Sequence, residues 1–308
     1  MNKFIFTDWH IKEKDLQECQ LIADELLCLI KEFSINEVCN IGDSFHVIKP
    51  SNLELDFFAN FLQSLPVPMK MIVASSHESV SENNHILNHF SILHNKIELY
   101  PTDWTDGNLL LGHYICAEAL KGFHSSITKK GLMDRSKLAL LGHQHTFEEL
   151  EPNRVYQLGS CRSVNFDESG EKKKIAIIIN YGTKNQKLEF IPLSSPYPMK
   201  TLTFVAGVTF PDWKKENPLT KTRYIFKDLD SYKNFIPFEQ KVKNYFTMFK
   251  VEFDLTKKDY IANEEKKESI TLEQSFKDFC VKNKVDNRIA NIINRAITTS
   301  GENNEVKS

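Results

Sequence analysis

The sequence predicts an α/β fold, because short apolar runs alternate with amphipathic helical segments in its first half. The runs 3–7, 37–41 and 70–74 have the length and composition of buried strands. Between them, 14–33 and 53–65 repeat apolar residues at helical spacing, which is typical of crossover helices that cover a sheet. A third observation is that nearly every apolar run leads into an acidic residue or a histidine.

These polar strand ends form an ordered series of motifs. A polar group at the carboxyl end of a packed strand lies at the rim of the sheet, where a site can form without polar groups entering the core. All ten histidines lie at or before position 145, so the first half of the chain is expected to carry the chemistry. The motifs are Asp8-Trp9-His10, Gly42-Asp43-Ser44-Phe45-His46, Ser76-His77-Glu78, Gly112-His113 and Gly142-His143-Gln144-His145.

The motifs predict a centre for two metal ions. Two ions held close together need a shared carboxylate, with imidazoles and a second carboxylate in the outer positions. Mixed nitrogen and oxygen ligands suit Mn²⁺, Fe²⁺ or Zn²⁺ better than Ca²⁺, and paired ions promote displacement at phosphorus. The predicted reaction is phosphoester hydrolysis. The candidate ligands are Asp8, His10, Asp43, His113, His143 and His145.

Each motif alone has a simpler explanation. A strand-end histidine often only binds a backbone carbonyl, and a strand-end aspartate is often only a helix N-cap. Five such endings in this order, the last of them a His-x-His pair, are not expected from those structural roles. The series as a whole therefore favours a metal centre.

The series resembles that of the calcineurin-like metallophosphoesterases, and within them the SbcD-type nuclease subunits of double-strand-break repair. His46, three residues after Asp43, stands where the nuclease family places an active-site histidine. The stretch 155–168 is similar to the Gly-Ser and Phe-x-Glu region of that family. The resemblance covers about residues 1–195 and implies a two-sheet α/β/β/α sandwich, followed by a small α/β capping domain and C-terminal helices.

The resemblance also implies roles for individual residues. His77 would be the catalytic histidine that protonates the leaving oxygen or stabilises charge at phosphorus, and His46 would assist at the same phosphate. The cofactor would be two divalent ions, most often Mn²⁺, with Mg²⁺, Fe²⁺ or Zn²⁺ as alternatives. One ion would be held by Asp8, His10, Asp43 and His145, and the other by Asp43, His113, His143 and the residue at position 76, which is Ser76.

The third motif departs from the family pattern. Ser75-Ser76-His77-Glu78 stands where the family has Gly-Asn-His-Asp/Glu, and a serine hydroxyl is a poorer neutral ligand than an asparagine carbonyl. Three outcomes stay open: a weak second site, a site completed by a neighbour such as Glu78, Asn83 or Asn84, or a degenerate centre. An active enzyme is favoured, because every other ligand and both candidate catalytic histidines are present.

Three regions are predicted along the chain. Residues 1–195 would form the nuclease domain, with a hairpin within 174–193 that closes a second sheet. Two prolines in 194–198 suggest a boundary. Residues 199–265 would form the capping domain, or an accessory domain packed beside the core. The helical segment 269–299 is the candidate contact for an SbcC-type coiled-coil ATPase, unless it only completes the capping domain.

Composition agrees with an intracellular protein. With 308 residues and 41% apolar residues, the chain can form one large core and a smaller domain. Six cysteines without paired spacing predict reduced thiols, and the absence of a signal peptide or a membrane-spanning run predicts a cytoplasmic location and no membrane partner.

The net charge of −2 argues against tight autonomous DNA binding. The clusters Lys129-Lys130, Lys172-Lys173-Lys174 and Lys214-Lys215 are predicted to be solvated turns.

The sequence thus predicts a Mn²⁺-dependent DNA exonuclease or endonuclease subunit for DNA end processing, repair or recombination, with an SbcC-type ATPase and DNA ends as partners. One alternative is a general phosphatase or phosphodiesterase of the same superfamily. Another is a non-catalytic DNA-end-binding or ATPase-regulating subunit. A homodimer is expected by analogy. Four apolar residues after the third motif are assigned to the core rather than to a dimer contact: Leu87, Phe90, Ile92 and Leu93.

Overall fold

Two β-sheets form the larger part of the fold. A computed structural model describes residues 1–73, 79–81, 84–88, 90, 96–119, 125, 127–205 and 207–254. The predicted C-terminal helices at 269–299, the end of the predicted capping domain, Ser76 and His77 lie outside these residues. Residues Met1–Asp254 form one compact unit. The division into a nuclease domain, a capping domain and a partner-binding segment stays a prediction.

The first sheet contains the strands that lead into the first three motifs. Its strands β1, β2, β3 and β6 are parallel, and β12 pairs antiparallel with β1 on the other side. In spatial order it consists of β13 (Lys187–Pro192), β12 (Lys174–Ile179), β1 (Lys3–Phe6), β2 (Glu37–Asn40), β3 (Met69–Ile72) and β6 (Ile97–Tyr100).

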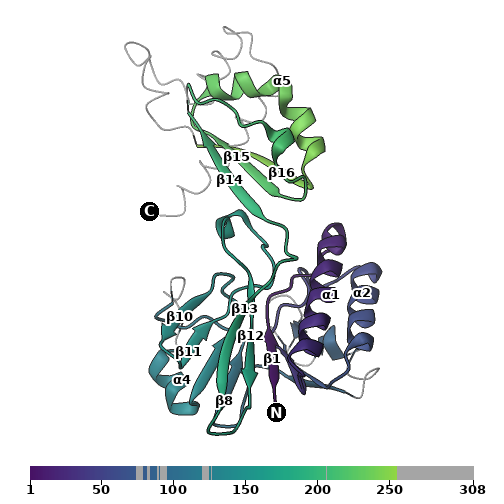
Figure 1. The fold of residues 1–308 in the computed structure, drawn as a ribbon, viewed down its shortest axis with the longest axis vertical. Helices are drawn as coiled ribbons and strands as arrows, with labels where there is room; N and C mark the ends of the chain where they lie inside the picture. The colour runs from purple at the N-terminus through teal and green to yellow at the C-terminus, as the bar shows by residue number, and fades with distance from the viewer. Residues whose placement is uncertain are drawn as a thin grey trace. The chain divides into compact units, whose positions relative to one another are not determined.

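Two helices cover one face of the first sheet (Figure 1). A short 3₁₀ turn, η1 (Glu13–Asp15), leads into α1 (Leu16–Glu32), and α2 (Asn52–Ser64) follows β2. Ser51 begins α2 with a capping box, in which its hydroxyl accepts a hydrogen bond from the Glu54 amide and the Glu54 carboxylate accepts one from the Ser51 amide. The two helices predicted from apolar spacing are therefore confirmed, with ends that differ by one or two residues.

The second sheet contains the strands that lead into the last two motifs. Strands β8, β9 and β11 are parallel, with antiparallel strands at both edges. Helix α4 (Lys129–Arg135) packs on its outer face through Leu132. In spatial order the sheet consists of β10 (Glu148–Glu151), β11 (Val155–Gln157), β9 (Leu138–Leu141), β8 (Leu109–Gly112) and β7 (Asp103–Thr105).

Alternate side chains of each central strand point to different layers. In β1, Phe4 and Phe6 belong to the core that includes the helices, whereas Ile5 packs between the two sheets. In β8, Leu111 packs between the sheets and Leu110 faces the α4 side. Because successive side chains of a strand alternate in direction, strands buried on both faces read as continuous apolar runs. The layers are helix, sheet, sheet and helix, as the sequence predicted.

The hairpin of β12 and β13 belongs to a different sheet from the one predicted. It extends the first sheet beside β1, so the expectation that it closes the second sheet is wrong. All four residues from Ile175 to Ile178 are fully buried, so β12 is covered on both faces, but strands of either sheet are buried in this way and the run does not specify the sheet. Ile177 packs on the helix side and Ile178 between the sheets.

A smaller α/β unit follows the sandwich in sequence. Its sheet is parallel throughout, in the order β14-β15-β16, and its core is rich in aromatic residues such as Phe226 and Phe235. Its elements are β14 (Met199–Phe204), η3 (Trp213–Lys215), β15 (Lys221–Phe226), α5 (Leu229–Tyr245) and β16 (Met248–Phe253). We call residues 199–253 the small α/β unit.

Two further short elements belong to the described part of the chain. A short ribbon pairs β4 (Ser79–Ser81) with β5 (Asn84–His85), and η2 (Phe166–Glu168) precedes β12. Leu87 and Phe90 are buried in the helix-side core, whereas Ile92 and Leu93 lie outside the described residues. In the described ranges no helix is both long and apolar enough to cross a membrane. The five cysteines described there are free thiols: Cys19, Cys28, Cys39, Cys116 and Cys161.

Candidate metal centre

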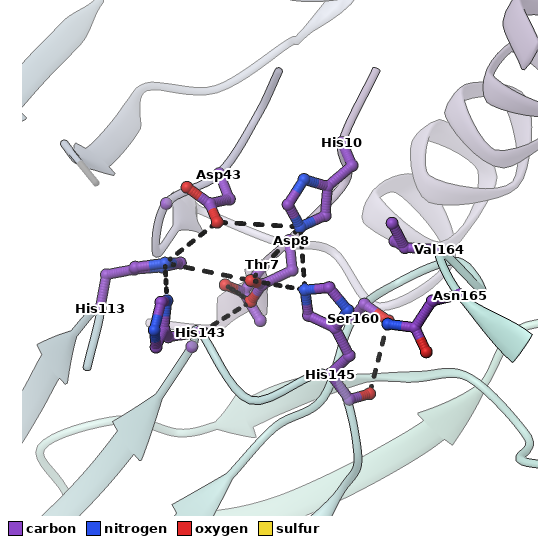
Figure 2. A network of polar contacts seen from close by, with 12 residues as sticks. Thr7, Asp8, His10, Asp43, His113, His143, His145, Ser160, Val164 and Asn165 are labelled. Carbon is purple, nitrogen blue, oxygen red and sulfur yellow. Dashed lines mark hydrogen bonds and ion pairs between the residues drawn. The ribbon is translucent and has the colours of Figure 1, made fainter. Parts of the chain in front are cut away.

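Six predicted ligands converge where strands of both sheets end (Figure 2). The first sheet contributes the residues that follow β1 and β2, and the second sheet contributes those that follow β8 and β9. They fall into two groups, and within each group the ligand atoms lie within 4.8 Å of one another. The first group is Asp8, His10 and His145, and the second group is Asp43, His113 and His143.

The backbone at four of these residues adopts a left-handed conformation that L-amino acids rarely take. Its φ angle is 51° at Asp8, 50° at His10, 50° at Asp43 and 79° at His143. Such angles cost about 1 to 3 kcal/mol each and persist where the surroundings impose them, most often at functional sites. Here the amide of Asp8 donates to the Gly42 carbonyl at 3.0 Å, and the amide of His10 donates to the Asp43 carbonyl at 2.9 Å. The first two motifs therefore hold each other in shape.

The first group brings two imidazole nitrogens close together. Nε2 of His10 lies 3.0 Å from Nε2 of His145, and Oδ1 of Asp8 lies 3.8 Å and 3.7 Å from these two atoms. Neutral imidazoles in this orientation direct lone pairs toward a common point. A cation among them would be bound by two nitrogens and one oxygen.

The second group repeats this arrangement and shares a carboxylate with the first. Nδ1 of His143 lies 3.2 Å from Nε2 of His113. Oδ2 of Asp43 lies 3.4 Å from His113 Nε2 and 3.7 Å from His10 Nε2, so it faces both groups. An oxygen placed in this way can serve two ions at once.

Acceptors behind the rings fix the tautomers of two histidines. Nδ1 of His113 donates to the Ile41 carbonyl at 2.7 Å, and Nδ1 of His145 donates to Oε1 of Glu168 at 3.0 Å. Because carbonyl and carboxylate oxygens accept hydrogen bonds, the proton of each neutral ring lies on Nδ1, which leaves the lone pair on Nε2. Partners of this kind orient metal-binding histidines and raise their basicity.

The Asp8 carboxylate has one oxygen bound and one directed into the site. Its Oδ2 accepts hydrogen bonds from Thr7 Oγ1 at 2.6 Å and from the His143 amide at 3.0 Å. Its Oδ1 is buried and has no hydrogen-bond donor among the described residues. Leaving a buried carboxylate oxygen without a donor is costly, and a cation would satisfy it. Two carboxylates and four imidazoles fit divalent ions of the Mn²⁺, Fe²⁺ and Zn²⁺ type.

Electrostatics keep both carboxylates ionised. Burial would raise the pKa of Asp8, but the positive charge that His113 and the other nearby histidines carry when protonated outweighs burial and lowers the pKa below its usual value. Burial likewise opposes ionisation of Asp43, but the close contact with His113 in its protonated form outweighs burial and lowers the pKa of Asp43. Ionised carboxylates are the form that binds cations.

The structure places His46 beside the first group, with its ring centroid 5.7 Å from that of His10. Ser76 and His77 lie outside the described residues, as do Glu78 and Asn83. The role of His77 and the completeness of the second group therefore stay predictions.

Three side chains near the site were not singled out from the sequence. Thr7 binds Asp8, as described above. Glu168 accepts from His145, and its Oε2 pairs with Lys173 Nζ at 2.6 Å. The side chain of Lys173 is only 2% exposed, so the prediction that 172–174 is a solvated turn is wrong for this residue. Glu168 lies in the Phe-x-Glu stretch, which was the available signal, but its partners could not be identified from the sequence.

Close packing around Gly142 yields a first testable prediction. A Cβ atom at this position would overlap Thr7 Oγ1 most closely and would lie 2.9 Å from the Ile41 carbonyl oxygen and 2.9 Å from His113 Nδ1, all closer than real Cβ contacts. Gly142→Ala should therefore displace Thr7, which binds Asp8, and the His113 ring, and weaken metal binding by about 10- to 100-fold, as does the loss of an orienting partner. Isothermal titration with Mn²⁺ measures this change.

Gly182→Ala is the control for that substitution, since nothing lies within 4 Å of a Cβ atom there. Unchanged Mn²⁺ affinity in Gly142→Ala would show that the His113 ring is not held as described.

Comparisons with known proteins show distant similarity. No protein-family model matches the chain, and no curated protein matches it. An archaeal phosphodiesterase structure is similar at 12% identity and a TM-score of 0.40, covering 63% of this chain and 100% of its own. A predicted phosphoesterase of Streptococcus pneumoniae is 11% identical with a TM-score of 0.32, covering 62% of this chain and 88% of its own. A Thermus thermophilus protein is 13% identical with a TM-score of 0.36, covering 62% of this chain and 98% of its own.

Proposed function

We propose that this chain is a metal-dependent phosphoesterase that hydrolyses phosphodiesters with two divalent ions. One observation carries the proposal: two groups of ligands lie side by side, and the Asp43 carboxylate faces histidines of both. Four ligand residues in left-handed backbone conformations support it, because strain of that kind is retained where function requires it.

Each residue of the site would have a distinct role in metal binding or catalysis. Asp8, His10 and His145 would hold one ion, His113 and His143 the other, and Asp43 would serve both. Ions bound there would supply Lewis acidity and neutralise charge at phosphorus. His46 lies beside the first group and would contact the same phosphate. His77 would act as the proton donor to the leaving oxygen, as the family resemblance implies.

We further propose that the substrate is DNA and that the ions are Mn²⁺. The resemblance to SbcD-type subunits supports this substrate, as does the position of His46 next to a candidate ligand. Residues 199–254 carry ten Lys or Arg against seven Asp or Glu, although the whole chain has a net charge of −2. A locally basic segment favours contact with phosphates. Assembly with an SbcC-type ATPase and homodimerisation belong to the same proposal.

The proposal is tested by incubating end-labelled double- and single-stranded linear DNA with the protein and Mn²⁺, with bis-p-nitrophenyl phosphate assayed in parallel. We expect DNA cleavage that requires Mn²⁺ and falls by about 10²- to 10⁴-fold in His77→Ala, the usual range for loss of a general acid. Hydrolysis of the small ester alone would indicate a general phosphodiesterase. No turnover of either substrate would contradict the proposal and favour a non-catalytic subunit with a degenerate centre.

A further inference from the structure

A buried lysine joins the small α/β unit to helix α1. Lys221, the first residue of β15, is 2% exposed, and its Nζ donates to Glu18 Oε2 at 2.7 Å and to the Ser163 carbonyl at 2.9 Å. Glu18 is 1% exposed, and its other oxygen accepts from the Tyr197 amide at 2.8 Å. Both oxygens of Glu18 are thus bound by the chain that leads into and through the small α/β unit.

The same glutamate contacts an arginine that reaches a candidate metal ligand. Arg162 is 3% exposed, its Nε lies 3.4 Å from Glu18 Oε2, and its Nη2 donates to Asp15 Oδ2 at 2.5 Å. Its Nη1 donates to the backbone carbonyl of His10 at 3.1 Å. We call Asp15, Glu18, Arg162 and Lys221 the buried charge cluster.

A second connection runs from the small α/β unit to the other histidine of the first group. The guanidinium of Arg223, in β15, stacks 5.2 Å from the ring of Phe166 in η2. Ser169 Oγ, just after η2, donates to the Met199 carbonyl at 3.0 Å. The last residue of η2 is Glu168, which accepts the hydrogen bond from His145 Nδ1.

Both connections end at the first group of ligands. Arg162 reaches the backbone of His10, Glu168 reaches the ring of His145, and the Nε2 atoms of these histidines lie 3.0 Å apart. The second group is anchored differently, since His113 is held by the Ile41 carbonyl next to β2.

We propose that Lys221, Glu18 and Arg162 are positioning residues, through which the docking of the small α/β unit sets the geometry of His10 and His145. The consequence for function, which rests on the metal-dependent activity proposed above, is that this unit controls the affinity of one of the two metal sites. The first site is then more sensitive than the second to anything that moves the unit, since the second is linked to it indirectly, through Asp43 and the His143 amide.

The chemistry of the cluster supports positioning over simple stabilisation. Buried ion pairs lose hydration and add little net stability compared with apolar residues of similar size, whereas they fix the mutual geometry of the groups that they join. Two acids and two bases balance in charge, and the guanidinium fork directs one donor to Asp15 and another to His10.

The test uses the full-length protein labelled with ¹⁵N in its histidine rings and the substitution Lys221→Met. In the metal-free protein we expect the ring signals of His10 and His145 to shift clearly more than those of His113 and His143. In Mn²⁺ titrations we expect one of two sites to weaken by about 10- to 100-fold. Lys227→Met is the matched control, because Lys227 follows β15 but is 41% exposed and pairs with Asp254.

Further variants keep the outcome decisive. Arg162→Met should shift the same ring signals and weaken the same metal site. It removes the cation that Asp15 and Glu18 share, however, and can prevent folding. Lys221→Met is the safer variant, because Arg162 still contacts Glu18. Arg162→Lys should restore part of the affinity. A folded Lys221→Met protein with unchanged His10 and His145 signals, or with both sites weakened equally, would overturn the proposal. A wild-type protein that binds no metal would refute the proposed function, whereas the metal-free ring signals would still decide the positioning role.

Discussion

Asp43→Asn is expected to remove hydrolysis almost completely, by about a thousandfold or more. Asp43 Oδ2 faces histidines of both groups, so the substitution weakens both candidate metal sites at once. Losing about 4 kcal/mol of charge stabilisation at phosphorus corresponds to that factor in rate. The measurement is kcat/KM for bis-p-nitrophenyl phosphate and DNA over a series of Mn²⁺ concentrations.

Asparagine has nearly the same shape as aspartate, so the fold should be retained, as thermal unfolding of the metal-free protein would show. Asp24→Asn on the exposed face of α1 is the control and should keep full activity. If Asp43→Asn retained more than a tenth of wild-type kcat/KM, a bridging role for Asp43 would be ruled out.

The second large effect is expected from Glu168→Ala. Glu168 is 4% exposed and binds His145 on one side and Lys173 on the other. Its removal leaves a buried ammonium short of its partner, which costs about 3 to 5 kcal/mol in typical buried pairs. The loss in free energy of unfolding should lie near the lower end of this range, because Lys173 keeps its bonds to Glu171 and to the His145 carbonyl. Urea unfolding measures this loss.

The same substitution should weaken Mn²⁺ binding by about 10- to 100-fold, because His145 loses the acceptor that orients its ring. Glu168→Gln separates the two effects: the amide oxygen can still accept from His145, but the charge opposite Lys173 is gone. We therefore expect Gln to restore most of the metal affinity and only part of the stability. Equal metal affinity in wild type and Glu168→Ala would contradict the orienting role.

The fold was largely predictable because the burial of central strands is encoded locally. Runs such as 109–111 and 138–141 are apolar at successive positions, and their polar ends mark the rim of a sheet. The neighbour of each strand is not encoded locally. The run at Ile175–Ile178 correctly predicted a buried strand, but nothing in it specified β1 as the partner.

The convergence of the candidate ligands was predictable for the same reason, since each lies within four residues of the end of its strand. Their supporting residues were not. Lys173 lies in a run of three lysines, which is usually solvated, and it is buried where Glu168, Glu171 and the His145 carbonyl bind its ammonium group. Glu18 and Lys221 are separated by 203 positions, so their contact exists only in the folded chain. Charged residues carry no sequence signal for burial unless the partner is known.

The most direct test of the two-ion centre is the number of Mn²⁺ ions bound per chain, measured by equilibrium dialysis followed by elemental analysis. The structure predicts two ions in the wild-type protein, and about one in His143→Ala, which removes a ligand of the second group only. A wild-type value of one or none would contradict a two-ion centre, and a value of one would point to Ser76 as the place where the second site fails.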